Sequence, residues 1–474
     1  MSLYKRTCLL LFCSLLCAKV YSVELYLPLK LDPLFDSKIE KLFVLANMPI
    51  IKRPLPLSHV REALNRIKHE HPTLATSIQR HLKRYDAKLG ISHLQLSISA
   101  PSGEPQTLSN QRGMDTSANY SSSFSGFWQA TDWLVVNAGF ITSNKESAHK
   151  STFAEGSYLS IGNEYLQADI GMRPHWLGPF QESDMLLSSN AAALPSITFS
   201  NTTAVTVLGF SYEIFFAEMS ESYQILSDDR TERRTGNPKI FGVHTSFEPT
   251  QGVAISFNRL LQYGGADRDD SFKSLMNAFF KVKANDNSGI EGNDFGNQVS
   301  SIATRYTFTG DVPLAIYMEY AGEDTSRTSE VHLGNTSLML GLHMPKITQN
   351  LDVTYEFAEW QNGWYVNGNY GDGLRQHGSI IGHWGAEHRE FTDAAGATAH
   401  TAKLNWYIDN DAALTTTYRQ LTNAPYAHEE YSTGYQFSGE YHKALNKFAF
   451  GVSLILGNTV YDEEIAAISG TVRW

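Results

Sequence analysis

From about residue 88 to its end, the chain alternates apolar and polar side chains with a period of two. In the segment 166–173, LQADIGMR, one face is apolar while the other is charged, polar or tiny, and 351–357 and 448–456 follow the same rule. Comparable segments occupy 91–100, 119–129, 133–142, 152–162, 240–248, 253–262, 298–308, 314–321, 335–344, 399–408, 411–420, 429–441 and 461–474. This repeated alternation predicts an all-β fold for residues 88–474.

Strands of about ten residues with one apolar face occur in soluble β-sandwiches and β-helices as well as in transmembrane barrels. Here tight turns, such as 163–164 and 249–252, alternate with long polar loops, such as 263–297 and 360–375, as they do in outer-membrane barrels. Tyr and Trp gather near the strand ends, where aromatic girdles meet lipid headgroups. These features favour a barrel in a bacterial outer membrane, in contact with outer-membrane lipid and lipopolysaccharide.

The last predicted strand ends on Trp474, with Val472, Ile468 and Ala466 on the same face. An aromatic terminal residue on an alternating strand resembles the signal read by the barrel assembly machinery, which we expect as a partner. Because hydrocarbon offers no partner for backbone amides, the strands must close into a barrel without edges. We expect about sixteen to twenty strands, since the segments 203–219 and 377–395 each fit one long strand or a hairpin.

The first 22 residues are typical of a cleaved secretion signal. Lys5 and Arg6 precede an apolar run at 9–16, which is too short to span a membrane, and we expect cleavage after Ser22. Cys17 raises a lipoprotein site as an alternative, but Leu16 stands where that signal has a small residue. The chain is therefore expected to be exported, with no transmembrane helix in the mature protein.

The mature chain after residue 22 would carry no cysteine, because all three cysteines lie within the signal. This excludes disulfide bonds, thiolate catalysis and cysteine metal sites. Removal of the three basic residues of the signal leaves 35 Lys and Arg against 49 Asp and Glu, a net charge of −14. Such an acidic surface argues against nucleic acid as a partner. One local basic patch, Arg230, Arg233, Arg234 and Lys239, is a candidate for such a ligand but is better explained as a solvated loop.

Between residues 23 and 87 the hydrophobic period is helical, which predicts a small bundle ahead of the barrel. Ser37 and Glu40 match a capping box at the start of a first helix. A second helix is expected to start at Ser58, and a third near Pro72, which suits the first turn of a helix. So few residues bury little apolar surface, so the bundle should pack against something larger.

One segment does not fit a plain barrel strand. Residues 171–200, GMRPHWLGPFQESDMLLSSNAAALPSITFS, contain a proline break after a strand, an aromatic-Gly-Pro turn, a Ser-Ser-Asn run and a second proline. This order resembles the capsule assembly Wzi family. The segment 377–390, HGSIIGHWGAEHRE, is similar to the family's downstream segment with an Ile-Gly-His core. Pro-Leu-Ser at 56–58, with the helices around it, resembles the family's beginning.

The resemblance implies an eighteen-stranded outer-membrane barrel with a helical bundle of residues 23–87 at its periplasmic end. It also implies a lectin-like protein, and not an enzyme, that holds capsular or related extracellular polysaccharide at the cell surface. A family tryptophan pair is replaced here by His175-Trp176. One aromatic residue is thus lost, which weakens any transfer of a binding role to position 175.

Sugar rings have apolar C–H faces and a hydroxyl rim, so proteins bind them with flat aromatic faces flanked by polar groups. The loop that starts at 360, WQNGWY, has this composition, although Trp360 and Tyr365 fit a membrane girdle equally well. Trp364 follows Asn362-Gly363 and is expected at a loop tip. The candidate glycan-binding residues, expected toward one opening or in the lumen beneath it, are Trp176, Trp360, Trp364, Trp384, Arg173 and Asn190.

No catalytic, metal or cofactor motif stands out. The chain contains no Gly-x-Ser-x-Gly elbow, His-Glu-x-x-His helix or phosphate-binding glycine loop. His383, Glu387 and His388 lack zinc-site spacing, and Asp286, Ser288, Glu291 and Asp294 only partly match a calcium loop. Two other functions stay open beside glycan binding. A diffusion porin would use the same strands, and an outer-membrane hydrolase could carry a dispersed Ser–His dyad.

Overall fold

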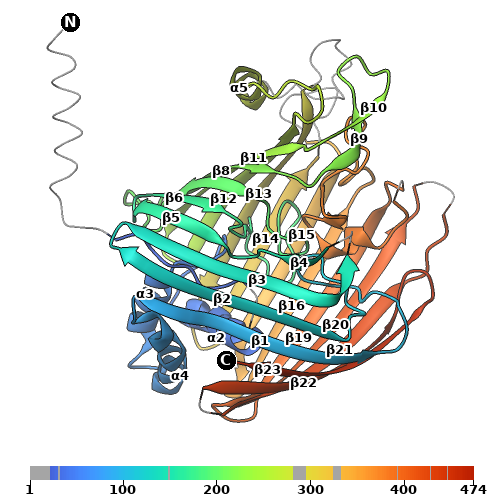
Figure 1. Cartoon of the computed structure of the whole chain (residues 1–474). Helices are drawn as coiled ribbons and strands as arrows, with labels where there is room; N and C mark the ends of the chain where they lie inside the picture. The colour runs from blue at the N-terminus through green and yellow to red at the C-terminus, as the bar shows by residue number, and fades with distance from the viewer. Residues whose placement is uncertain are drawn as a thin grey trace, which may run out of the picture.

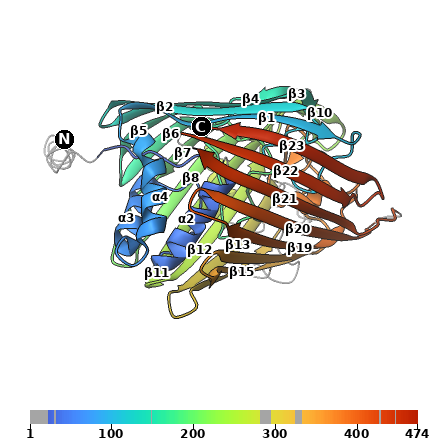
Figure 2. The same ribbon diagram turned by 90° about the horizontal axis from the view of Figure 1, so that it is seen from below.

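The structure is a computed structural model that describes residues 22–29, 32–147, 150–280, 295–323, 333–391, 393–426, 429–445 and 447–474. Its main element is a closed antiparallel β-barrel with three helices at one end (Figures 1 and 2). No helix in the described part of the chain is long and apolar enough to cross a membrane.

The barrel wall is a ring of eighteen strand positions. Nineteen strands fill them, because the short strands β4 and β5 lie one after the other beside β3. The wall strands are β1 (Leu89–Pro101), β2 (Tyr120–Thr131), β3 (Leu134–Ser147), β4 (Lys150–Phe153), β5 (Tyr158–Asn163), β6 (Leu166–Gly171), β7 (Ser196–Ser200), β8 (Ser211–Glu218), β11 (Lys239–Thr250), β12 (Val253–Tyr263), β13 (Gly296–Phe308), β14 (Leu314–Gly322), β15 (Thr336–Thr348), β16 (Leu351–Trp360), β19 (Gly396–Tyr407), β20 (Ala412–Ala424), β21 (Gly434–Leu445), β22 (Phe448–Asn458) and β23 (Glu464–Arg473). β4 and β5 both pair with β3, and β23 pairs with β1, which closes the ring. The expected eighteen-stranded barrel is thus confirmed.

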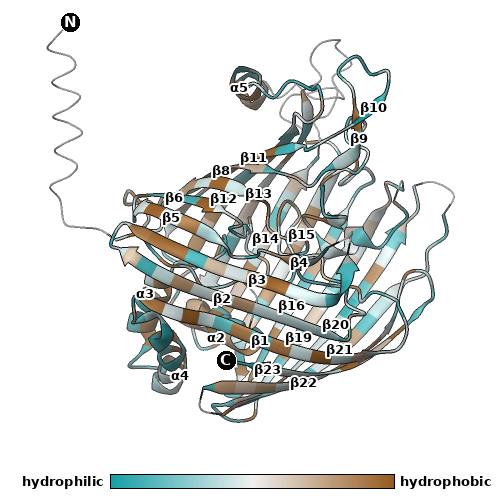
Figure 3. Cartoon of the chain, in the orientation of Figure 1, coloured by the Kyte–Doolittle hydropathy of each residue, from teal (hydrophilic) through white to brown (hydrophobic). Residues whose placement is uncertain are grey.

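The wall is apolar on its outer face and polar on its inner face. In β6, Leu166 and Ile170 are 55% and 43% exposed, whereas Gln167 and Asp169 between them are fully buried. Figure 3 shows the same alternation as brown residues spaced along the wall strands. A soluble sandwich would bury its apolar face, so this arrangement excludes that alternative and fits a wall that faces lipid.

Two of the three expected helix starts agree with the structure. α3 (Leu57–Ile67) and α4 (Pro72–Leu82) begin where the sequence indicated, but α2 (Pro33–Leu45) begins four residues before the expected capping box. Asp32 is the N-cap, and its side chain accepts a hydrogen bond from the Phe35 amide at 3.1 Å. Asp-Pro therefore supplies a better helix start than Ser37, which lies inside the helix.

The helices pack against and into one end of the barrel. Leu42, Val60 and Ile78 of the helices share an apolar cluster with the wall residues Phe127 and Val135. Figure 2 shows α2 within the ring of strands, where it contacts β13 and β15. The bundle thus rests on the larger body that its small core requires.

The C-terminus lies at the helix end of the barrel. The Trp474 amide donates a hydrogen bond to the Leu94 carbonyl at 2.9 Å, and the Arg84 guanidinium lies 5.0 Å from the centre of the Trp474 ring. The connections 102–119, 361–395, 425–433 and 459–463 lie at the opposite end, here called the loop end. That the helix end faces the periplasm, and that a domain boundary falls at residue 87, remain predictions.

The two segments that fitted either one long strand or a hairpin, 203–219 and 377–395, contribute fewer wall strands than expected. Residues 203–219 supply only β8, while 377–395 supply no wall strand and instead form part of a small hairpin and a short 3-10 helix, η3 (Trp384–Glu387). This hairpin pairs β17 (Arg375–Gln376) with β18 (Ser379–Ile380). A second hairpin, β9 (Ser222–Leu226) with β10 (Arg233–Gly236), and a helix, α5 (Phe272–Phe280), lie at the loop end (Figure 1).

Candidate functional site

Two segments fold inward and fill part of the lumen. Residues 172–195, which follow β6, and 361–395, which follow β16, are here called the plug. Leu177, Phe180 and Met185 of the first segment are fully buried and share one apolar cluster with Ile381 and Trp384 of the second. Inward wall residues such as Tyr317 join the same cluster. The barrel therefore contains a hydrophobic core of its own.

The two motif segments of the sequence pack directly against each other in the plug. A Cβ atom added to Gly382 would lie 2.1 Å from the Met185 carbonyl oxygen, so only glycine fits there. The Tyr365 hydroxyl donates to that carbonyl at 2.5 Å and accepts a hydrogen bond from the His383 amide at 2.9 Å. The Ile-Gly-His core thus serves close packing between the two segments.

A buried carboxylate of the wall holds the first plug segment. Glu356 of β16 accepts hydrogen bonds from the Gln181 amide at 2.7 Å and the Glu182 amide at 3.0 Å. The Tyr317 hydroxyl donates to the same carboxylate at 2.8 Å. Backbone groups that would otherwise lack partners in the lumen are satisfied in this way.

A second anchor joins the plug to helix α2. The Glu40 carboxylate pairs with the guanidinium of Arg53 and, at 3.0 Å, with that of Arg305 on β13. The same two arginines donate to the Phe180 and Pro179 carbonyls, at 3.1 Å and 3.0 Å. Burial alone would raise the pKa of Glu40, but the two guanidiniums outweigh it and lower the pKa to about 2. The expected capping role of Glu40 is wrong, because its side chain serves this ion triad.

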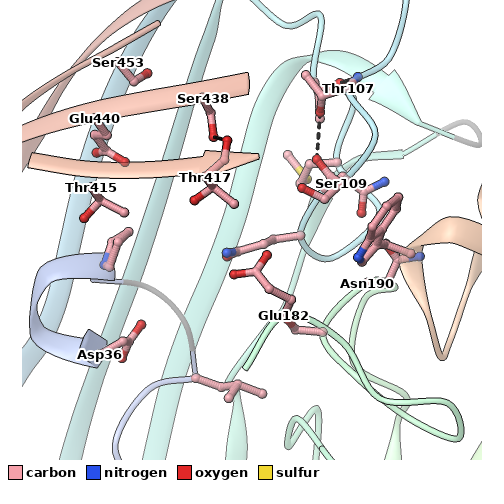
Figure 4. A pocket seen from close by; sticks show the side chains of 18 of the residues that line it. Asp36, Thr107, Ser109, Glu182, Asn190, Thr415, Thr417, Ser438, Glu440 and Ser453 are labelled. Carbon is pink, nitrogen blue, oxygen red and sulfur yellow. Dashed lines mark hydrogen bonds between the residues drawn. The ribbon is translucent and has the colours of Figure 1, made fainter. Parts of the chain in front are cut away.

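Between the plug, α2 and one side of the wall lies a cavity of about 510 Å³. Figure 4 shows Thr415, Thr417 and Ser438 on the wall strands, with Glu182 and Asn190 of the plug across from them. Half of the residues that line it, among those the structure describes, carry a hydroxyl or an amide. Its volume lies within the range of about 300–1,000 Å³ that is usual for ligand pockets.

The charged groups of the cavity are largely paired with one another. Glu182 accepts from Arg419 at 2.6 Å and lies 3.9 Å from the Lys403 ammonium. Glu440 pairs with Arg473 at 3.0 Å. A ligand in this space would therefore meet mainly neutral hydroxyl and amide groups, which suit the hydroxyl groups of a sugar.

Two of the six candidate residues line this cavity. Asn190 uses its amide donor on the Ile380 carbonyl at 2.9 Å, which fixes its orientation. Trp384 is 2% exposed, and its indole nitrogen has no hydrogen-bond partner among the described residues. The structure thus brings Trp384 and Asn190 to one polar space, as the expectation of a site in the lumen requires.

The other three tryptophans lie in the plug core. Trp176, Trp360 and Trp364 are buried and do not line the cavity, so none offers a ring face to it. The expected loop tip at Trp364 is wrong, because the chain after β16 turns inward and not outward. The girdle alternative for Trp360 and Tyr365 is wrong for the same reason, since both face the lumen.

Arg173 belongs to a buried ion network. It pairs with Asp169 at 3.1 Å and with Glu213 at 3.0 Å. Glu213 also lies 2.7 Å from the ring nitrogen of His175, whose ring stacks on Phe215 with 4.2 Å between the ring centres. Burial lowers the pKa of His175. These groups hold the start of the plug and do not reach the cavity.

The weaker sequence candidates find no support in the geometry. Among the described residues, no three His, Cys, Asp or Glu side chains are arranged to hold a metal ion, and His383 instead accepts from the Gly385 amide. The four calcium-loop residues, 286, 288, 291 and 294, lie outside the described residues. In the basic patch, Arg234 pairs with Asp267 and Lys239 pairs with Asp270, so the patch offers little free positive charge.

Sequence reasoning missed the hydroxyl-rich wall of the cavity. Ser121, Ser122 and Ser123 of β2 line the same space as Thr415 and Thr417 of β20. In the sequence these residues stand out only as polar positions of wall strands. Such positions line the lumen of any barrel, so they do not mark a binding site. Their grouping depends on which strands leave room beside the plug.

Comparisons with known proteins agree with the fold. The family model of the capsule assembly protein Wzi matches residues 98–453. A solved structure of Wzi from Escherichia coli, described as a carbohydrate-binding β-barrel of the outer membrane involved in group 1 capsule assembly, covers 96% of this chain and 99% of its own at 15% identity, with a TM-score of 0.68. An uncharacterized 55.8 kDa protein in the cps region of Klebsiella pneumoniae is 25% identical over 296 residues, which are 61% of this chain and 55% of that relative. The match therefore spans little more than half the length of the curated relative.

Proposed function

Because this chain belongs to the capsule assembly protein Wzi family, we propose that it is a lectin-like outer-membrane protein that binds and retains capsular or related extracellular polysaccharide at the cell surface. Its likeness to a solved Wzi described as carbohydrate-binding supports this function. Family membership also agrees with the expectation that the chain is not an enzyme, and no catalytic step is proposed.

The observation that carries the proposal is the polar cavity beside the plug. A sugar presents many hydroxyl groups, each able to donate and accept, and the cavity wall is rich in groups that do the same. Trp384 adds a large planar side chain and an indole donor without a partner in the described structure. Of the six candidate residues, we propose Trp384 and Asn190 as those that contact sugar.

The plug favours binding over diffusion. A porin needs a continuous water-filled lumen, whereas here the apolar plug core spans from the motif segments to inward wall residues such as Tyr317 and Ala358. The helix α2 also enters the opposite end of the barrel. Retention of a polymer at the surface requires no such channel.

The orientation and export of the chain belong to the same proposal. A signal of residues 1–22 would direct it to the periplasm, and the barrel assembly machinery would read the strand that ends on Trp474. The helices would then face the periplasm, and the loop end would face the capsule. Lipopolysaccharide in the outer leaflet of the membrane would surround the wall near the loop end.

The test is retention of capsule by cells. In a capsulated host that lacks the gene, the chain should move polysaccharide from the culture medium to the cell-bound fraction, while the total amount stays constant. Purified protein in detergent should also bind the purified polymer, and heat-modifiable migration on a gel should report its folded state. Equal release of polymer with and without the chain, together with no binding by folded protein, would refute the proposal.

A further inference from the structure

A group of aromatic side chains surrounds Asp393 at the loop end of the barrel. They are Tyr426, Tyr431 and Tyr461, here called the aromatic rim. We propose that the aromatic rim is a second polysaccharide contact surface, separate from the lumen cavity, that stacks on uncharged faces of sugar rings. This inference rests on the proposed function and specifies where the polymer first meets the protein.

The rim lies where three connections meet. Residues 388–395 end the plug and lead into β19, while 425–433 join β20 to β21 and 459–463 join β22 to β23. Each of these connections follows the loop end of its strand, on the opposite side of the barrel from Trp474. The rim therefore occupies the face that the proposed orientation turns toward the capsule.

Asp393 holds the rim together. Its carboxylate is 2% exposed and accepts from the Tyr431 hydroxyl at 2.7 Å and from the Tyr426 amide at 3.3 Å. The Tyr431 hydroxyl also accepts a hydrogen bond from the Glu390 amide at 3.1 Å. Tyr426 and Tyr431 are thus tied to the end of the plug, which places them before any ligand arrives.

The outer rings of the aromatic rim are exposed to solvent. Tyr426 is 63% exposed and Tyr461 is 43% exposed. Tyr431 lies partly buried beneath them, with its ring centre 6.0 Å from that of Tyr461 at an interplanar angle of 61°. Exposed rings on a rigid base offer apolar area to a sugar at a low cost in conformational entropy.

The rim turns toward the barrel opening and not toward lipid. Girdle aromatics stand on the outer face of wall strands, whereas β20 ends at Ala424 and β21 begins at Gly434. The hydrogen bonds to Asp393 hold Tyr426 and Tyr431 against the end of the plug. A membrane role would require the opposite direction.

The charges around the rim indicate which sugars it suits. Burial raises the pKa of Tyr461, and the nearby carboxylates of Glu390, Glu429 and Glu463 add to this effect, so that the pKa reaches about 12. Carboxylates accept hydrogen bonds from sugar hydroxyls but repel uronic acids. The rim therefore suits neutral sugar units or neutral faces of a charged polymer.

The experiment uses the full chain in detergent and capsular polysaccharide purified from the strain that carries the gene. A double variant, Tyr426→Ala with Tyr461→Ala, should bind this polymer about tenfold more weakly, which corresponds to about 1.4 kcal/mol. Tyr223→Ala is the matched control, because this tyrosine is 65% exposed but lies on β9, away from the rim. Heat-modifiable migration confirms that each protein is folded.

The outcomes separate the two proposals. If the parent protein is folded and binds no polymer, the proposed function fails and this inference falls with it. If the parent binds and the folded rim variant binds as tightly as Tyr223→Ala, only the rim assignment is overturned. Reduction of the uronic carboxyl groups of the polymer to alcohols should leave binding equal or tighter, and a loss of binding on reduction would also overturn it.

Discussion

Replacement of Glu40 by Gln should release helix α2 from the barrel while the wall stays folded. Two buried guanidiniums, those of Arg53 and Arg305, would lose their shared carboxylate. Removing one partner from a buried ion group costs about 3–5 kcal/mol. The lowered pKa leads to a similar figure, because a fall from 4.5 to about 2 corresponds to about 3 kcal/mol of favourable interaction in the folded state.

The same pair of values sets a pH window. The pKa of Glu40 is lower in the folded state than in the unfolded state, so its contribution is complete above about pH 4.5 and is lost as the pH falls toward about 2. The parent protein should therefore loosen its helix end in this acidic range. The Gln variant, which has no carboxylate to protonate, should show a smaller change over the same range.

Limited proteolysis of the chain in detergent is the assay, since a released helix exposes the segment before β1 while the wall stays resistant. Glu62→Gln is the matched control, because Glu62 forms an exposed pair with Arg66 on α3 at 2.6 Å. Exposed pairs of this kind contribute about 0.2–1 kcal/mol. If Glu40→Gln and Glu62→Gln were cleaved at the same rate, the ion triad would not hold the helix and the reasoning would be refuted.

Three further predictions concern the plug and the cavity. Gly382→Ala should disturb the packing of the two plug segments, because the new Cβ would lie 2.1 Å from the Met185 carbonyl, and planar-bilayer conductance should rise from the low level expected of the parent. A parent with the conductance of an open porin would reverse the ranking of the two functions. Trp384→Ala should weaken retention of polysaccharide by cells several-fold, whereas Trp406→Ala, a change to a 48% exposed wall residue, should not, and equal retention would remove Trp384 from the site. Trp364→Ala should lower stability by about 3–5 kcal/mol through loss of buried contacts, visible as a lower midpoint of denaturation, and an unchanged midpoint would contradict its place in the plug core.

The wall could be predicted closely from the sequence because a strand that crosses lipid has a strict period. β14 occupies Leu314–Gly322 where 314–321 was expected, and β12 occupies Val253–Tyr263 where 253–262 was expected. The errors fall where this constraint is absent. β7 was missed because its five residues follow the irregular plug segment, and 377–395 looked like a strand although its apolar residues pack inside the lumen.

The binding site was harder to predict because tryptophan is used in three places in such a barrel. A lipid-facing girdle, a plug core and a sugar site all select large aromatic side chains, so composition alone does not separate Trp364 from Trp384. The surroundings of each side chain in the structure do separate these uses. The Trp364 carbonyl is held by the buried Arg389, which draws its loop into the core, while the Trp384 side chain borders the cavity.

The plug connects the two proposed contact surfaces. The second plug segment carries Trp384 at the lumen cavity and, nine residues later, Asp393 at the aromatic rim. Between them, the His388 ring donates to the Leu108 carbonyl at 2.6 Å, and the Leu108 amide donates to Gln436 of β21 at 2.8 Å. These bonds tie the plug to the connection 102–119 and to the wall, so cavity and rim lie on one fixed frame. A polymer bound at both would gain avidity from each contact without moving the barrel. Loss of either surface should therefore weaken retention without abolishing it, whereas loss of the plug packing should abolish both contacts together.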